Sequence, residues 1–245
     1  MFPKNIIQFL FICFLSLILS LPFLYILKAV KIENQNLQTT LLFIICLSIF
    51  IGLVHIINYK NNNKLSYKIK PFNGHFLLFL ILIVWIIETI FFVPFRIYFF
   101  LNNNYAPDIY LIFGALLLAP ILEEIIFRNI LLNTLLHSYS KNKSILISAC
   151  LFSLIHGNPV QIFYALISGI FLGLIYSKNK NIAYTIILHF FINLFVFIWN
   201  YYFREFYNSS FFFLGIGLNA IISFLLLFYM NKNQGYSLIK LIKQE

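Results

Sequence analysis

Eight runs of apolar residues, most of them about 20 residues long, dominate this chain. The runs lie near 6–27, 39–58, 76–95, 109–136, 144–157, 160–177, 182–200 and 211–230. An α-helix needs about 20 apolar residues to cross the hydrocarbon core of a bilayer, because each residue advances it by only about 1.5 Å. The runs therefore predict an all-α fold, a polytopic membrane helix bundle with about eight transmembrane helices.

The composition supports this prediction, because 62% of the residues are hydrophobic and only 10% are charged. Soluble domains average about 45–50% apolar and about 25% charged residues. The net charge of +10 does not indicate binding to nucleic acid, since the lysines occupy short gaps between the apolar runs. The expected partner is the lipid bilayer. The many Asn, Ile, Lys and Phe residues, typical of an AT-rich genome, favour a bacterial cell membrane.

The basic residues predict the orientation of the helices. Groups follow the second, fourth, sixth and eighth runs: Lys60, Lys64, Lys68 and Lys70; Lys141 and Lys143; Lys178 and Lys180; Lys232, Lys240 and Lys243. With eight spans these groups share one side, and lysines concentrate on the cytoplasmic side of membrane proteins. We therefore expect both termini in the cytoplasm, and residues 201–245 to form the last transmembrane helix and a basic cytoplasmic tail.

Two adjacent acids and a base interrupt the fourth run, in the stretch APILEEIIFRN at 119–129. A charged side chain at the bilayer centre costs at least about 2.5–3.5 kcal/mol, so such residues are retained for a reason. Glu124 and Arg128 are four apart, share one helix face and are expected to form an ion pair. Glu123 points about 100° away. It has no local partner, so it is predicted to be available for chemistry.

Two further polar sites lie downstream. His156 stands four residues after Phe152 in the fifth run, and His189 stands four before Asn193 in the seventh. Counted from the cytoplasmic helix ends, Glu123, both histidines and Asn193 lie roughly 11–20 Å deep. We therefore expect them to line one intramembrane polar cavity that opens to the cytoplasm. A single intramembrane histidine is equally well explained as a hydrogen-bond partner between helices.

Other features of the runs are interpreted structurally. Pro120 is expected to kink or divide the fourth run, because proline cannot complete the helical hydrogen-bond pattern. The stripe of Ala165, Gly169 and Gly173 is expected to be a close helix contact. Glu88, in the third run, has no obvious partner in the sequence.

Three motifs in order resemble those of the CPBP family, the CAAX prenyl proteases and bacteriocin-processing or immunity proteins also called Abi. The motifs are Glu123-Glu124-x-x-x-Arg128, Phe152-x-x-x-His156 and His189-x-x-x-Asn193. Ala119-Pro120 and Phe127 also fit the family's pattern, whereas Asn129 stands where many members have Gly. The resemblance covers about 109–200 and predicts a CPBP-like catalytic core there. Residues 1–100 would be N-terminal transmembrane helices without diagnostic motifs.

The resemblance implies an intramembrane, glutamate-dependent endopeptidase that cleaves a peptide or membrane-protein substrate. Glu123 and His156 would activate a water molecule for attack on the scissile carbonyl. His189 and Asn193 would donate hydrogen bonds to the oxyanion that forms. The residues expected to support the site are Glu124, Arg128 and Phe152. No cofactor is expected in this mechanism.

Two alternatives remain at this point. Glu123, His156 and His189 could instead bind Zn²⁺ and leave an open position for water, although the zinc-protease signature H-E-x-x-H is absent. The chain could also be a non-proteolytic bacteriocin-immunity or membrane scaffold protein, but the motifs supply both a base and oxyanion donors. Possible substrates are a prenylated C-terminal peptide, a bacteriocin or signal-peptide precursor, and a membrane-anchored regulator.

Overall fold

The computed structural model of the chain describes residues 2–30, 32, 34–61, 71, 73–93, 108–201 and 210–234, and these are helical apart from short connections. The chain divides into two compact units. Unit 1 comprises Met1–Ile69 and Asp108–Ile186, and unit 2 comprises Lys70–Pro107 and Ile187–Glu245. Two lysines of the predicted basic tail, Lys240 and Lys243, lie outside the described residues, as do Lys64, Lys68 and Lys70.

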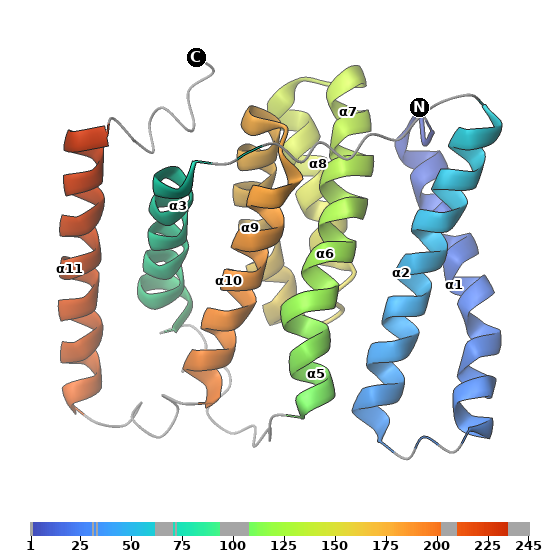
Figure 1. Ribbon diagram of the computed structural model, residues 1–245, viewed down its shortest axis with the longest axis horizontal. Coiled ribbons are helices and arrows are strands. Elements are labelled where there is room, and N and C mark those ends of the chain that lie inside the picture. The colour runs from blue at the N-terminus through green and yellow to red at the C-terminus, as the bar shows by residue number, and fades with distance from the viewer. Residues whose placement is uncertain are drawn as a thin grey trace. The chain divides into compact units, whose positions relative to one another are not determined.

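The described residues form eight helical segments, which correspond to the eight apolar runs (Figure 1). Unit 1 contains α1 Ile6–Ala29, α2 Gln35–Lys60, α5 Ile109–Phe113, η2 Gly114–Leu118, α6 Ala119–Glu124, η3 Ile125–Leu132, α7 Asn133–Ser138, α8 Lys141–Leu154 and α9 Pro159–Asn179. Unit 2 contains α3 Gly74–Ile87, η1 Glu88–Phe92 and α11 Ser210–Gln234, and α10 Ile182–Tyr201 begins in unit 1 and continues in unit 2. The all-helical prediction is confirmed for the described residues.

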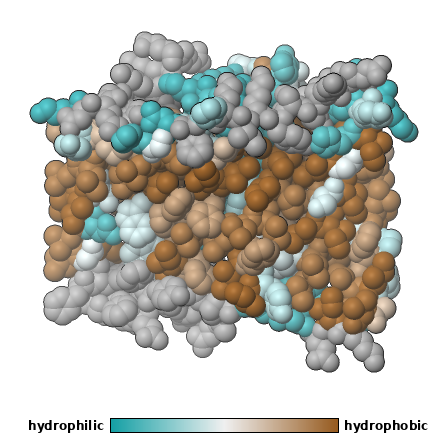
Figure 2. All heavy atoms as spheres, viewed as in Figure 1, coloured by the Kyte–Doolittle hydropathy of each residue, from teal (hydrophilic) through white to brown (hydrophobic). Residues whose placement is uncertain are grey.

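Five of these helices are long and apolar enough to cross a membrane: Ile6–Ala29, Gln35–Lys60, Pro159–Asn179, Ile182–Trp199 and Leu214–Lys232. Hydrophobic residues cover the middle of the helices in each unit, and hydrophilic residues gather towards the helix ends (Figure 2). Large apolar side chains such as Phe11 on α1 and Phe228 on α11 are exposed. This pattern is that of an integral membrane protein.

Asparagine side chains begin four of the helices. Asn5, Asn34 and Asn73 each accept a hydrogen bond from the backbone N–H three residues ahead. Asn158 accepts from Val160 and Gln161 at the start of α9. The first turn of a helix leaves N–H groups without intrahelical partners, and an Asn cap satisfies one of them. The sequence therefore marks these four helix starts directly.

The fourth run forms one continuous helix from α5 to α7, with wide π turns on both sides of Pro120 (Figure 1). The segment η2 ends two residues before Pro120, where the N–H of Ala119 bonds to the carbonyl of Gly114, five residues back. The segment η3 follows Glu124 directly. Pro120 has no N–H to donate, so the hydrogen-bond pattern around it has to change. The expected break is therefore replaced by a local widening of the helix.

Aromatic rings and small residues build the core of unit 1. Phe9 on α1 packs edge-on against Phe50 on α2, with ring centroids 5.2 Å apart, and against Phe127 on η3 at 6.0 Å. On the other side of Phe127, Phe152 of α8 lies at 5.2 Å. A Cβ atom placed on Gly169 of α9 would come within 3.2 Å of the backbone of α8. The predicted close contact of the small-residue stripe is confirmed, and its partner is α8.

Trp85 of α3 contacts both α10 and α11 in unit 2. Its ring lies 4.7 Å from Phe195 and 5.8 Å from Trp199, both on α10, measured between ring centroids. Its indole Nε1 donates a hydrogen bond to Asn219 Oδ1 on α11, at 3.1 Å. One aromatic side chain therefore joins the three helices of this unit.

Candidate active site

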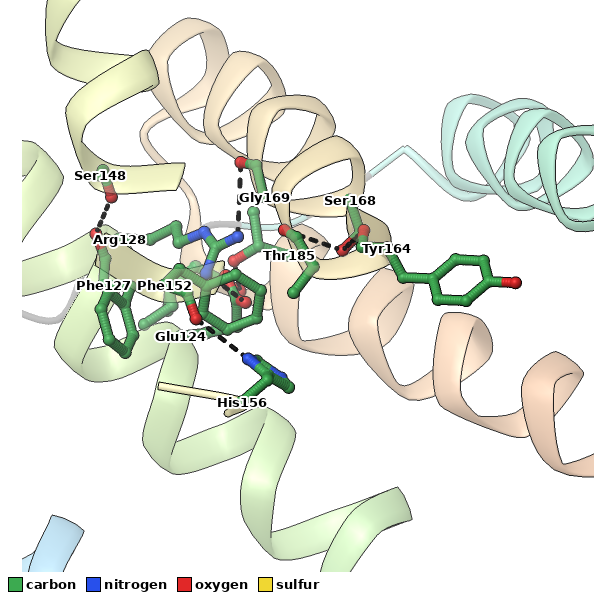
Figure 3. A network of polar contacts seen from close by, with 12 residues as sticks. Glu124, Phe127, Arg128, Ser148, Phe152, His156, Tyr164, Ser168, Gly169 and Thr185 are labelled. Atoms are coloured by element: carbon green, nitrogen blue, oxygen red, sulfur yellow. Dashed lines mark hydrogen bonds and ion pairs between the residues drawn. The ribbon is translucent and has the colours of Figure 1, made fainter. Parts of the chain in front are cut away.

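Glu123 and Glu124 are the last two residues of α6, and both are buried in the described structure. The Nη1 atom of Arg128, one turn later on η3, lies 3.0 Å from Oε1 of Glu124 (Figure 3). Both side chains are at most 1% exposed, so the two charges have no access to bulk water. The predicted Glu124–Arg128 ion pair is confirmed.

Arg128 also joins the neighbouring helices. Its Nη2 atom donates a hydrogen bond to the backbone carbonyl of Gly169 on α9, at 3.4 Å. Its guanidinium carbon lies 4.5 Å from the centroid of the Phe152 ring on α8, in the geometry of a cation–π contact. The arginine therefore holds three elements, η3, α8 and α9, around the acidic pair (Figure 3).

Glu123 is not isolated, so the prediction that it has no local partner is wrong. Arg128 interacts electrostatically with Glu123 as well as with Glu124. Charges act over longer distances in a low-dielectric interior than in water, so a neighbour on another helix face still contributes. Glu123 therefore lies in the field of the same arginine that pairs with Glu124.

His156 lies in the short turn between α8 and α9 and is half-buried. Its Nδ1 atom is 3.0 Å from the carbonyl oxygen of Phe152, and its ring packs edge-on against the Phe152 ring at 5.1 Å. A carbonyl oxygen can only accept, so Nδ1 is the nitrogen that carries the proton in this contact. In the neutral ring the lone pair is then on Nε2. The Phe152 carbonyl thus selects the tautomer, and the Phe152 ring fixes the orientation.

The turn that carries His156 has a defined backbone path. The N–H of His156 bonds to the carbonyl of Ser153, and the N–H of Asn158 bonds to the carbonyl of His156. Gly157 between them has φ +68°, a conformation that a glycine adopts without the strain of a side chain. The turn is stabilised further by the Asn158 cap of α9.

The second pair of predicted residues lies in unit 2. His189 is 5% exposed, and Asn193, one turn later on α10, is half-buried. Their approach to Glu123 and His156, and the polar cavity between them, stay predictions. Glu88 is also in unit 2, at the first position of η1, and is 2% exposed.

Several supporting groups were not identified from the sequence. The Ser148 hydroxyl donates a hydrogen bond to the carbonyl of Phe127 within η3, at 2.9 Å. The Tyr176 hydroxyl donates to Asn129 Oδ1, at 3.2 Å. The Gly169 carbonyl could have been anticipated from its place in the small-residue stripe, because a close helix approach exposes backbone carbonyls to the neighbouring helix. Ser148 and Tyr176 carry no comparable signal.

The predicted metal ligands are divided between the two units. Within either unit, the part of the chain that the structure describes has no group of three His, Cys, Asp or Glu side chains placed to hold a metal ion. The zinc alternative would need Glu123 and His156 from unit 1 together with His189 from unit 2.

Part of the chain matches a known protein family. Residues 105–195 match the family described as type II CAAX prenyl endopeptidase, Rce1-like. The matched segment includes both acids, Arg128, His156, His189 and Asn193. No curated protein and no solved structure matched the chain in the same comparison.

Proposed function

Because residues 105–195 match the Rce1-like family of type II CAAX prenyl endopeptidases, a family of peptidases, we propose that this chain is a glutamate-dependent intramembrane endopeptidase. The observation that carries the proposal is the buried acidic pair held by Arg128 among apolar helices, beside a histidine of fixed tautomer. Ion pairs are rare inside membrane proteins and mark functional sites.

In the proposed reaction, a water molecule attacks the carbonyl carbon of the scissile peptide bond. Glu123 takes one proton from the water and then delivers it to the nitrogen of the leaving amine, so the carboxylate is regenerated. His156 positions the water through Nε2. Proton transfer by a positioned side chain contributes typically about 10²–10⁴-fold to the rate.

His189 and Asn193 are proposed as donors to the oxygen that becomes negatively charged. They share a face of α10, since they are one turn apart. An oxyanion donor in a water-excluded site is worth about 2.7–4 kcal/mol of transition-state stabilisation.

Glu124 and Arg128 would act by positioning. Arg128 contacts Glu124, Gly169 and Phe152, and Phe152 in turn holds His156. This chain of contacts connects the end of α6 to the histidine turn. A displacement of about 1 Å at a catalytic group can reduce a rate by about 10²-fold, so the arrangement has a direct consequence for turnover.

The proposed location is a cell membrane, with the basic helix ends in the cytoplasm. In unit 1, the end of α2, the turn between α7 and α8 and the end of α9 lie at the same end (Figure 1). These ends carry Lys60, Lys141 and Lys180. Their common location supports the orientation predicted from the positive charges.

The test uses purified protein in liposomes and two peptides that end in Cys-aliphatic-aliphatic-any residue, one farnesylated and one not. We expect cleavage by the wild type and none by Glu123→Gln, whose amide keeps the shape but cannot take a proton. Glu88 is also a buried acid, but it lies in unit 2, so Glu88→Gln is the matched control and should retain cleavage. Cleavage by Glu123→Gln at the wild-type rate would refute the assignment of the base.

The same assay addresses the two alternatives. Loss of activity on chelation, with recovery on adding Zn²⁺, would favour the zinc-dependent mechanism. The scaffold alternative would be favoured if bacteriocin, signal-peptide and prenylated precursors all stayed intact and Glu123→Gln kept the cellular phenotype of the wild type.

A further inference from the structure

A second set of polar contacts joins η3 and α7 to α9. The Tyr176 hydroxyl donates to Asn129 Oδ1 at 3.2 Å, and Lys180 Nζ donates to Asn133 Oδ1 at 3.3 Å. Lys180 Nζ also lies 5.4 Å from the centroid of the Tyr176 ring. We call these four residues the polar seam.

The polar seam leads from the end of α9 to the candidate active site. Asn129 follows Arg128 directly, and Asn133 lies four residues further on. Tyr176 and Lys180 are also four apart, so each step of the seam is about one helical turn. Lys180 and Asn133 are half-buried, whereas Tyr176 and Asn129 are at most 3% exposed. Polar groups therefore continue from the basic end of unit 1 inwards to Asn129, the residue next to Arg128 in the chain.

One atom of the seam lacks a hydrogen bond. Asn129 Nδ2 is fully buried and has no partner among the residues that the structure describes. Buried donors are almost always satisfied by protein or by ordered water, because an unsatisfied donor loses its hydration without replacement. A water molecule of about 30 Å³ that also bonds to the Tyr176 hydroxyl would satisfy this group.

We propose that Asn129 Nδ2 binds a buried water, and that the polar seam is the route by which water reaches the active site from the Lys180 end. This inference rests on the proposed hydrolytic function, since each turnover consumes one water. The apolar surroundings favour a polar route for water: Phe127 and Phe152 beside Arg128 are buried, and Ile130 and Leu131 next to the seam are at most 1% exposed.

The first experiment measures hydration without any substrate. In full-length protein whose three native cysteines are replaced by alanine, Asn129→Cys and Leu131→Cys are compared for reaction with Ag⁺ in liposomes. Protection from later alkylation of the unfolded chain reports the reaction. Leu131 is the matched control, because it is 1% exposed and lies two residues away on the same segment. Only the ionised thiol reacts readily, so we expect Asn129→Cys to react at least about 10-fold faster.

The second experiment measures whether the polar seam supplies water to the active site. Asn129→Leu/Tyr176→Phe removes both partners of one hydrogen bond while keeping their size, which leaves stability nearly unchanged. We expect its kcat for the farnesylated peptide to fall about 10-fold with KM unchanged. If Asn129→Cys reacts as slowly as Leu131→Cys, the seam is dry and the proposal fails. If the double variant keeps the wild-type kcat, the seam does not supply the reaction. Absence of wild-type cleavage would refute the proposed function instead, while the Ag⁺ result would still decide hydration.

Discussion

Replacing Glu124 by Gln should lower the free energy of unfolding by about 3–5 kcal/mol, because it leaves Arg128 charged and buried without its carboxylate. The guanidinium is 1% exposed, so water cannot replace the lost partner. Its remaining direct contacts are the Gly169 carbonyl at 3.4 Å and the face of the Phe152 ring, neither of which carries a full negative charge. Glu123 still acts on Arg128 electrostatically, but it is not the carboxylate of the 3.0 Å contact.

The expected change is large enough to measure by thermal unfolding in detergent. For a chain of 150–250 residues, about 1 kcal/mol shifts Tm by about 2–4 °C, so the Tm of Glu124→Gln should fall by about 6–20 °C. Glu123→Gln is the control and should lose less, because Glu123 is outside the 3.0 Å contact. Cleavage of the farnesylated peptide, measured in parallel, should show the opposite order, with the larger loss in Glu123→Gln.

A double variant tests the physical reason. Glu124→Gln/Arg128→Met removes both charges, and replacing a buried ion pair by apolar groups of similar volume is often neutral or stabilising. We expect it to recover most of the lost Tm without recovering full activity. The reasoning would be refuted if Glu124→Gln were no less stable than Glu123→Gln, or if the double variant were less stable than Glu124→Gln.

Asn193→Ala should lower kcat by about 10²–10³-fold with little change in KM. In the double variant with His189→Ala, the fold-loss of kcat should be smaller than the product of the two single losses, because both donors act on one oxygen. Gly169→Ala should lower the free energy of unfolding by about 1–3 kcal/mol, because the new Cβ meets the α8 backbone at 3.2 Å. Gly52→Ala, with nothing within 4 Å, should not lower stability in the same Tm measurement. A cysteine at Lys141 should react with a membrane-impermeant maleimide only from the cytoplasmic side, and labelling from the other side would reverse the predicted orientation.

The helices and the local contacts of the site could be predicted from the sequence, because both depend on short-range spacing. The bounds of the eight apolar runs lie within a few residues of the bounds of the observed helices. The Glu124–Arg128 pair follows from their four-residue spacing, and the stripe that includes Gly169 follows from repeated small residues. These patterns need no knowledge of which helices are neighbours.

Contacts between distant segments could not be predicted in the same way. The sequence does not show that Arg128 reaches the Gly169 carbonyl, 41 residues away, or that Tyr176 bonds to Asn129, 47 residues away. It also suggested that Glu123 has no partner, because helix geometry considers only neighbours in the chain and not the field of a buried arginine. The π turns were missed for a related reason, since Pro120 indicates only that the regular pattern must change.

The widened turns on either side of α6 have a consequence for the tolerance of this helix to deletions. A π turn holds one residue more than the α-helical turn it replaces, so removing a single residue from η3 would let the segment return to regular α-helix. Residues on the two sides of the deletion would then keep nearly their present relative rotation, because the wide turn absorbs the extra residue. Arg128 could still face Glu124 while Asn133 stayed aligned with Lys180 on α9. A single-residue deletion in η3 should therefore be tolerated better than one in regular α-helix such as α8, where it would rotate the two sides by about 100°.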